Sequence, residues 1–198
     1  MPSPSTASAS ASDLETWFGR MEEAEQAEGW LAWCRDRGIF IASANEFVDA
    51  LANELRCLAG TILEIGSGVG ELAAELGRRN VSVIATDPAA EAPNVIRLSA
   101  REALKLYKPA TVLSSFLPVD AGVEADVLRC ASVQRYLYLG PIIMGRVGPE
   151  ALWNVTGWSA KRLLEVEDVL ISRLDILPDF SRRTHLRGAG AVLLQRVQ

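Results

Sequence analysis

A chain of 198 residues with 49% hydrophobic and 23% charged residues is typical of one globular domain with short extensions, and this balance excludes fibrous and wholly disordered classes. The formal net charge of -5 provides no broad basic field for phosphate backbones, so no nucleic-acid partner is expected. Cys34, Cys57 and Cys130 are too few and too widely spaced for a disulfide framework or a zinc cluster, and no metal site is expected.

Residues 1–12, MPSPSTASASAS, have neither the basic start nor the apolar stretch of a secretory signal. Their composition predicts a disordered Ser/Ala/Pro tail. No apolar run in the sequence approaches the roughly 18 residues that a membrane-spanning helix requires. We therefore expect a cytoplasmic protein without a membrane partner.

Residues 13–60 are predicted to form N-terminal helices that act as a lid or cap. Ser12 and Glu15 have the spacing of a capping box, and Ser43 and Glu46 repeat it before a second helix. A glycine follows each helical stretch and is expected to end it. The aromatic residues of the first helix either pack against the rest of the chain or line a substrate pocket.

After residue 60 the sequence alternates between short apolar runs and amphipathic stretches. This alternation predicts a doubly wound α/β fold, in which parallel strands are joined by right-handed helical crossovers. The expected parallel strands cover residues 61–65, 81–87, 94–98, 110–118 and 135–141. The expected helices between them cover residues 71–80, 99–107 and 122–133.

The last quarter of the sequence is predicted to complete the sheet. Residues 151–165 have a helical pattern, and residues 166–177 and 185–197 read as two strands. The loop between these strands is too short for a parallel crossover, so they should pair as an antiparallel hairpin. The expected fold is a mostly parallel, seven-stranded sheet with helices on both faces, formed by residues 61–198.

The stretch LEIGSGVGELAAEL, residues 63–76, places three glycines in the turn between the first predicted strand and its helix. Open α/β sheets bind ligands in the crevice at such turns. Glycines allow backbone angles that other residues avoid, and they let a ligand lie directly against the main chain. The free N–H groups of the following helix favour an anion or a carboxylate. The turn is therefore predicted to hold a nucleotide-like molecule.

The spacing of the glycines indicates which kind of nucleotide. The dinucleotide fingerprint requires a glycine at position 71, where this chain has Glu71, and a carboxylate there would repel a pyrophosphate. A P-loop is excluded because its Gly-Lys-Ser/Thr ending is missing. The order acid-x-Gly-x-Gly-x-Gly from Glu64 to Gly70 resembles the class I, Rossmann-like S-adenosylmethionine-dependent methyltransferases. S-adenosylmethionine has no phosphates, so acidic neighbours suit it better.

This resemblance implies S-adenosylmethionine as the cofactor and assigns residues to its parts. Glu64 would orient the methionine end, and Asp87, at the end of the second strand, would bind the ribose hydroxyls. The adenine position falls at Ser99 or Ala100, with Arg101 following, where the acid that family members often carry is missing. The implied cofactor-binding residues are Glu64, Gly66, Ser67, Gly68, Gly70, Asp87, Ala100, Arg101, Ser114 and Ser115.

Alternatives to these roles remain open at the level of sequence. The glycines could serve only the tight turn, and Asp87 before Pro88 could be a turn former or a helix cap. The hydroxyls of Ser114 and Ser115 could bind backbone groups at the end of a strand instead of a ligand.

Few residues can be assigned a catalytic role from the sequence, because the methyl group of the sulfonium cofactor is already activated. Alignment alone can account for roughly 7 to 11 kcal/mol of barrier reduction, so an acid or base is needed only when the acceptor must lose a proton. His185 and Asp120 are the candidate catalytic residues, and each could instead be structural. Arg182 and Arg183 could bind an acidic substrate or be solvated.

Taken together, the sequence predicts a cytoplasmic S-adenosylmethionine-dependent methyltransferase that acts on a small molecule. One alternative uses the same cofactor for cyclisation or aminocarboxypropyl transfer and releases methylthioadenosine. A second alternative is a non-catalytic binding or regulatory module. A homodimer through an edge strand or the aromatic N-terminal helices is a further hypothesis.

Overall fold

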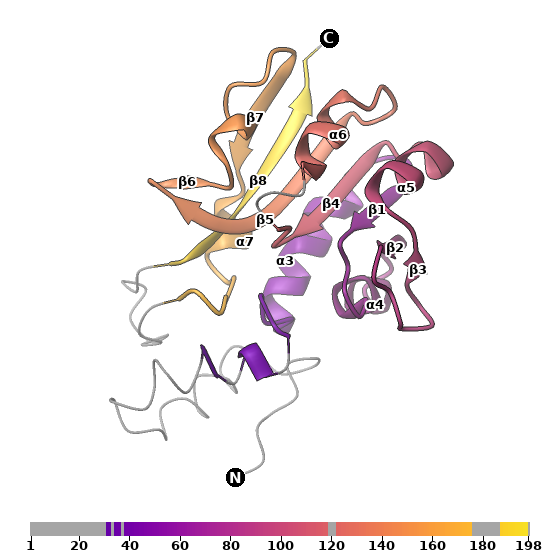
Figure 1. Ribbon diagram of the computed structural model, residues 1–198. Helices are drawn as coiled ribbons and strands as arrows, with labels where there is room; N and C mark the ends of the chain where they lie inside the picture. Colours follow the sequence, from indigo (N-terminus) through magenta and orange to yellow (C-terminus); the bar gives the residue numbers. More distant parts are fainter. Residues whose placement is uncertain (1–30, 33, 37, 119–121, 176–186, 198) are drawn as a thin grey trace.

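The apolar runs after residue 60 form the centre of a mixed eight-stranded sheet (Figure 1). A computed structural model describes residues 31–32, 34–36, 38–118, 122–175 and 187–197. The strands are β1 (Ile62–Ile65), β2 (Val83–Asp87), β3 (Ile96–Arg97), β4 (Thr111–Ser115), β5 (Arg135–Ile143), β6 (Arg146–Val147), β7 (Trp158–Arg162) and β8 (Ala189–Arg196). The helices are α3 (Asn45–Arg56), α4 (Glu71–Arg78), α5 (Ala100–Tyr107), α6 (Val123–Arg129) and α7 (Leu164–Glu167), with the 3-10 helix η1 (Glu150–Leu152).

The strands lie in the order β3-β2-β1-β4-β5-β8-β7, and β6 pairs with β5 outside this path. The first five strands in the chain, β1 to β5, are parallel where they pair, and β8 runs antiparallel to both β5 and β7. Because β1 has β2 on one side and β4 on the other, the strand order reverses at β1. Crevices for ligands open at the carboxyl ends of strands on either side of such a reversal.

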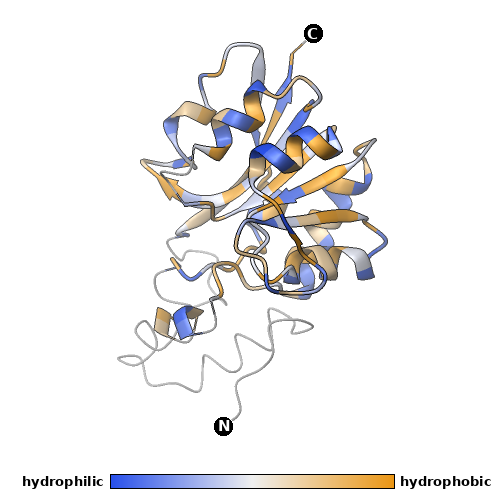
Figure 2. Cartoon of the chain, turned by 45° about the vertical axis from the view of Figure 1, so that its right-hand side comes forward, coloured by the Kyte–Doolittle hydropathy of each residue, from blue (hydrophilic) through white to orange (hydrophobic). Residues whose placement is uncertain are grey.

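Helices cover both faces of the sheet. On one face α3, α4 and α7 contribute to a hydrophobic cluster with β1, β4, β5 and β8, and on the other face α5 and α6 contribute to a second cluster. A parallel sheet requires this double covering, because its strands are apolar on both sides. Every residue of β1 is buried for that reason, including Glu64. Figure 2 shows the central strands largely in the hydrophobic colour, whereas the helices carry both colours.

The α3 helix belongs to the packed core. Its side chains Phe47, Val48 and Leu51 are fully buried in the cluster that also contains Leu113 and Leu137 of the sheet. The capping box expected at the start of this helix is wrong, because the N-cap residue is Ala44 and no side chain caps it. The division of the chain at residue 60 stays a prediction, and most of the first expected helix lies outside the described residues.

The predicted parallel strands and the α/β fold are confirmed, but the last quarter of the chain differs from the expectation. The helix predicted over residues 151–165 is wrong, because that stretch forms the end of η1, the strand β7 and only the first two residues of α7. Gly157, with φ of 79°, precedes β7, and five residue pairs join β7 to β8. This pairing with a distant segment overrides the local helical pattern.

The strand predicted over residues 166–177 is also wrong. Its first part belongs to α7, and in the described remainder only Ser172 forms a β-bridge, with Ile41. The strand that pairs antiparallel with β8 at the edge of the sheet is therefore β7, and β5 turns back into the short strand β6, which was not predicted. The sheet has eight strands instead of seven. None of the helices in the described part of the chain is long and apolar enough to cross a bilayer.

Candidate functional site

The glycine turn joins β1 to α4 at the strand-order reversal. Gly66, Gly68 and Gly70 have φ angles of 72°, 56° and 76°, in the region that side chains rarely adopt. A Cβ at Gly66 would lie 2.5 Å from Leu117 Cδ2, and one at Gly70 would lie 2.6 Å from Val95 Cγ2. A Cβ at Gly68 would meet no protein atom within 4 Å. Packing therefore explains the outer two glycines, whereas the middle one faces open space.

Strand β2 holds this turn in place. The backbone N–H groups of Gly66 and Ser67 both donate to the Thr86 carbonyl oxygen, at 2.9 and 3.1 Å. The Ser67 hydroxyl donates to the same oxygen at 3.2 Å. The Thr86 hydroxyl in turn donates to the Glu64 carbonyl oxygen at 2.8 Å. The ends of β1 and β2 are thus fixed to each other, which brings their last side chains together.

Asp87, the last residue of β2, contacts the turn directly. Its Oδ2 accepts a hydrogen bond from the Gly68 N–H at 3.0 Å, and its Oδ1 accepts one from the Ala89 N–H at 2.8 Å. The hydrogen bond from the Ala89 N–H is typical of an aspartate that forms a turn. The sequence analysis had named this role as an alternative for Asp87, which precedes Pro88. A carboxylate has about four lone-pair positions, so these two bonds leave capacity for a ligand.

Glu64 is a buried carboxylate beside the turn, with 2% of its surface exposed. Burial raises the pKa of Glu64 to about 7, a hydrogen bond from the Ala73 backbone N–H opposes this rise, and the charge of Asp87 adds to it. Ala73 belongs to the first turn of α4, whose N-cap Gly70 offers no side chain. The other carboxylate oxygen, Oε2, is buried and has no hydrogen-bond partner. A buried acceptor without a partner fits a donor from a ligand.

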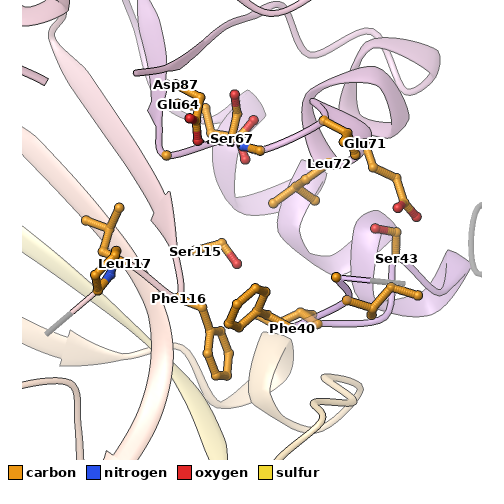
Figure 3. A pocket seen from close by; sticks show the side chains of 17 residues that line it. Phe40, Ser43, Glu64, Ser67, Glu71, Leu72, Asp87, Ser115, Phe116 and Leu117 are labelled. Carbon is orange, nitrogen blue, oxygen red and sulfur yellow. Dashed lines mark hydrogen bonds between the residues drawn. The ribbon is translucent and has the colours of Figure 1, made fainter. Parts of the chain in front are cut away.

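Two cavities meet at the turn, and we name each after one lining residue. The Phe40 cavity has a volume of about 310 Å³, and the Asp126 cavity has a volume of about 460 Å³. In the Phe40 cavity, Glu64, Ser67 and Asp87 gather at one end and Phe40 and Phe116 at the other, with the side chain of Ser115 between them (Figure 3). The two cavities share four lining residues, namely Gly66, Asp87, Leu117 and Pro118. Asp87 thus lies at the junction of the two cavities, where one ligand could extend into both cavities.

Most of the predicted cofactor residues line these cavities. The Phe40 cavity is lined by Glu64, Gly66, Ser67, Gly68, Asp87 and Ser115. The Asp126 cavity adds Ala100 and Arg101 to Gly66 and Asp87. Gly70 lines neither cavity and is the N-cap of α4.

Ser114 does not reach either cavity. Its hydroxyl is buried and lies 2.8 Å from the Tyr136 hydroxyl, because neighbouring residues of a strand point to opposite faces and Ser115 takes the cavity side. The two candidate catalytic residues, His185 and Asp120, lie outside the described residues, as do Arg182 and Arg183. Their roles stay predictions.

The structure adds residues that the sequence analysis missed. Asp126 lines the second cavity, and its Oδ2 accepts a hydrogen bond from Arg101 Nε at 2.7 Å. Phe40 reaches the first cavity from a distant, irregular segment, so no local sequence pattern marked it.

Ser99 was predicted as one candidate for the adenine position. It lines the Asp126 cavity, and its hydroxyl takes part in a capping box with Glu102.

The fold is shared with solved structures. An S-adenosylmethionine-dependent O-methyltransferase from Thermotoga maritima matches with a TM-score of 0.51 at 12% identity, over 85% of this chain and 71% of that one. A 1,6-didemethyltoxoflavin-N1-methyltransferase from Burkholderia thailandensis matches with a TM-score of 0.51 at 12% identity, over 93% and 88% of the two chains. The chain has the class I methyltransferase fold. No model of a protein family and no curated protein matches the sequence.

The surroundings of the glycines in the turn predict that two glycine substitutions lower the free energy of unfolding by different amounts. Gly70→Ala should lower the free energy of unfolding by about 2 kcal/mol or more, because its Cβ would overlap Val95 and Asn94. Gly68→Ala should lower it by roughly 1 kcal/mol, since only the left-handed backbone is strained there. Urea denaturation of both variants measures the difference. Equal losses would contradict the packing that the structure shows at Gly70.

The raised pKa of Glu64 predicts how stability depends on pH. Between pH 4.5, the ordinary value, and about 7, the folded state binds more protons than the unfolded state. The free energy of unfolding should therefore fall as pH rises through this window, by at most about 3 kcal/mol in total. Glu64→Gln removes this contribution, so wild type should lose more stability than the variant between pH 5 and pH 8.

Urea denaturation at pH 5 and pH 8 checks this expectation, with Glu91→Gln as the matched control, because Glu91 is exposed. The control should follow wild type at both pH values. If Glu64→Gln also follows wild type, Glu64 titrates in the folded protein as it does in water, and its burial as described is wrong.

Proposed function

We propose that the chain is an S-adenosylmethionine-dependent methyltransferase that transfers a methyl group to a small-molecule acceptor. The observation that carries this proposal is the buried, unpartnered Oε2 of Glu64 beside the glycine turn. Such an atom is costly unless a ligand supplies a donor, and the cofactor has an ammonium group at its amino acid end. The net charge of -5 supports a partner other than nucleic acid and is compatible with a cytoplasmic protein.

The residues around the turn fit the parts of this cofactor in order. Glu64 would hold the ammonium group, and the remaining lone pairs of Asp87 would accept hydrogen bonds from the ribose hydroxyls. The Asp126 cavity would take the adenine, where the Asp126 carboxylate offers an acceptor in place of the acid missing near Ala100. Cavities of about 300 to 1,000 Å³ are the usual size for small-molecule sites.

S-adenosylmethionine, when bound, supplies a methyl group that is activated by its sulfonium. In the proposed transfer, an electron pair of the acceptor nitrogen, oxygen or carbon would form the bond to this methyl carbon, and the electron pair of the broken carbon–sulfur bond would stay on sulfur. An acceptor that carries a proton would lose it to solvent or to a nearby base. The role of this chain is then to orient the acceptor in line with the methyl group and to exclude water. His185 and Asp120 remain the proposed bases for acceptors that need one.

Binding of S-adenosylmethionine and S-adenosylhomocysteine tests the proposal, measured by isothermal titration calorimetry. Wild type should bind both. Asp87→Ala should bind about 10- to 100-fold more weakly, because charge-assisted hydrogen bonds contribute roughly 1.5 to 3 kcal/mol each. Asp87→Asn keeps one carbonyl oxygen that can accept a hydrogen bond from the turn. Its affinity should lie between those of wild type and Asp87→Ala. Glu165→Ala, at an exposed position of α7, is the control and should bind like wild type.

Absence of binding to wild type would contradict the proposal and favour a non-catalytic module. The sulfur product of turnover separates the remaining alternatives. Methyl transfer leaves S-adenosylhomocysteine, whereas cyclisation or aminocarboxypropyl transfer leaves methylthioadenosine. Mass spectrometry of the reaction mixture identifies the product, and methylthioadenosine as the main product would overturn the proposed reaction.

A further inference from the structure

We infer that Ser43 is a specificity-determining residue, whose hydroxyl binds a hydrogen-bonding group of the acceptor on the side away from the transferred methyl group. This inference rests on the proposed function and names the chemical feature that the acceptor would need. The acceptor would combine an apolar body with a hydroxyl or amino group that reaches Ser43. Three observations carry the inference: the hydroxyl is not used by the neighbouring helix, it is buried without a partner, and it faces a cavity.

Ser43 lies just before the α3 helix but does not cap it. The N-cap of α3 is Ala44, and no side chain makes a capping hydrogen bond there. A serine caps a helix from the N-cap position, where its oxygen can accept from the N–H groups of the first turn. Ser43 stands one residue too early for this role. The Ser43 hydroxyl is therefore left over by the helix that follows it.

The Ser43 hydroxyl is enclosed but has no partner. Only 6% of the surface of Ser43 is exposed, and no hydrogen bond between residues that the structure describes involves its side chain. Ser43 lines the Phe40 cavity. Leaving a buried hydroxyl unpaired costs free energy, so the cavity is expected to hold a water or a ligand group against it.

The segment that carries Ser43 is held from outside the cavity. The Ala42 N–H donates to the Ile171 carbonyl oxygen at 2.9 Å, and Ile41 forms a β-bridge with Ser172. Ala42 itself is fully buried. The position of the Ser43 hydroxyl is thus set by the fold. A polar group that is preorganised in this way loses little freedom when a ligand binds.

Ser115 provides a second hydroxyl on the wall of the same cavity. It is the last residue of β4, and Phe116 after it has φ of 51°, which is unfavourable for a residue with a side chain. The Phe116 N–H donates to the Leu139 carbonyl oxygen at 2.8 Å and holds this bend. Within the described ranges the Ser115 hydroxyl, too, has no hydrogen-bond partner. It is placed to orient the acceptor nearer to the cofactor.

The two hydroxyls flank an apolar space. Figure 3 shows Ser43 and Ser115 on opposite sides of the cavity, between Leu72 and Phe40. Glu71 also lines the cavity and already has an interaction partner. In a mostly apolar site the few polar groups fix the orientation of the ligand. An apolar group opposite Ser43 would displace water without replacing its hydrogen bond, so a hydrogen-bonding group is favoured there.

Three pairs of small probes of matched size test the inference: p-cresol with hydroquinone, m-cresol with resorcinol, and o-cresol with catechol. Each pair exchanges a methyl group for a hydroxyl, at a different position on the ring. Ligand-observed NMR measures their affinities in the presence of saturating S-adenosylhomocysteine. In at least one pair, Ser43→Ala should shift the ratio of the two affinities towards the cresol by about 3- to 10-fold, the effect of one neutral hydrogen bond.

The ratio is taken within each protein, so a general effect of the substitution on the fold cancels. Ser159→Ala is the matched control, because Ser159 is an exposed residue of β7 that lines neither cavity. Its ratios should equal those of wild type. Ser43→Ala should bind S-adenosylhomocysteine as tightly as wild type, since Ser43 is assigned to the acceptor.

Calorimetry with S-adenosylhomocysteine separates the failure of this inference from the failure of the proposed function. If wild type does not bind that compound, the proposed function fails. If wild type binds it but no probe binds, or every ratio is the same in Ser43→Ala as in wild type, the inference is wrong and the proposed function stands. If Ser43→Ala loses affinity for S-adenosylhomocysteine instead, Ser43 belongs to the cofactor site, and the inference is again wrong.

Discussion

The site depends on one tight turn, in which the backbone between β1 and α4 bends against the end of β2 and leaves no room for a Cβ at Gly66 or Gly70. Two N–H groups of the turn bind the Thr86 carbonyl oxygen, and the Gly68 N–H binds the Asp87 carboxylate. Helix α4 begins directly after this bend, and the Ala73 N–H in its first helical turn donates a hydrogen bond to the Glu64 carboxylate. The positions of the buried Glu64 carboxylate, of the exposed backbone at Gly68 and of Asp87 therefore follow from the geometry of this one turn.

This geometry also explains why the polar and apolar parts of the site lie where they do. The reversal of strand order at β1 separates β2 from β4, so the end of β2 supplies Asp87 and the end of β4 supplies Ser115 and Phe116 to the same crevice. The first group makes the polar end of the Phe40 cavity and the second group makes its apolar end (Figure 3). A sulfonium cofactor and its acceptor would then meet across the strand ends, as the proposed transfer requires.

The parts of the fold that sequence could predict are those encoded by neighbouring residues. The apolar runs of β1, β2 and β4 and the glycine turn were predictable because burial on both faces and a tight bend each leave a local pattern. The turn contacts of Asp87 follow from its place at the end of the strand next to β1. By contrast, residues 158–162 became the strand β7 through pairing with β8, more than 25 residues away in sequence, and no local pattern shows such pairing.

The same distinction applies to the site. Ser114 was paired with Ser115 in the prediction, yet the alternation of the strand turns its hydroxyl towards Tyr136. Phe40 and Asp126 come from segments whose approach to the crevice depends on tertiary packing, namely the backbone bonds to Ile171 and Arg173 and the packing of α5 beside α6. These contacts became visible only once the elements were placed.

The pKa of Glu64 with and without cofactor product tests the central claim most directly, measured by carbon-13 NMR of its side-chain carboxyl during a pH titration. In the free protein the carboxyl should titrate near 7. With saturating S-adenosylhomocysteine, whose ammonium would face the unpartnered oxygen, the pKa should fall clearly below that value. A pKa that stays near 7 in the saturated protein would show that Glu64 does not hold the amino acid end of the ligand, and would contradict this account.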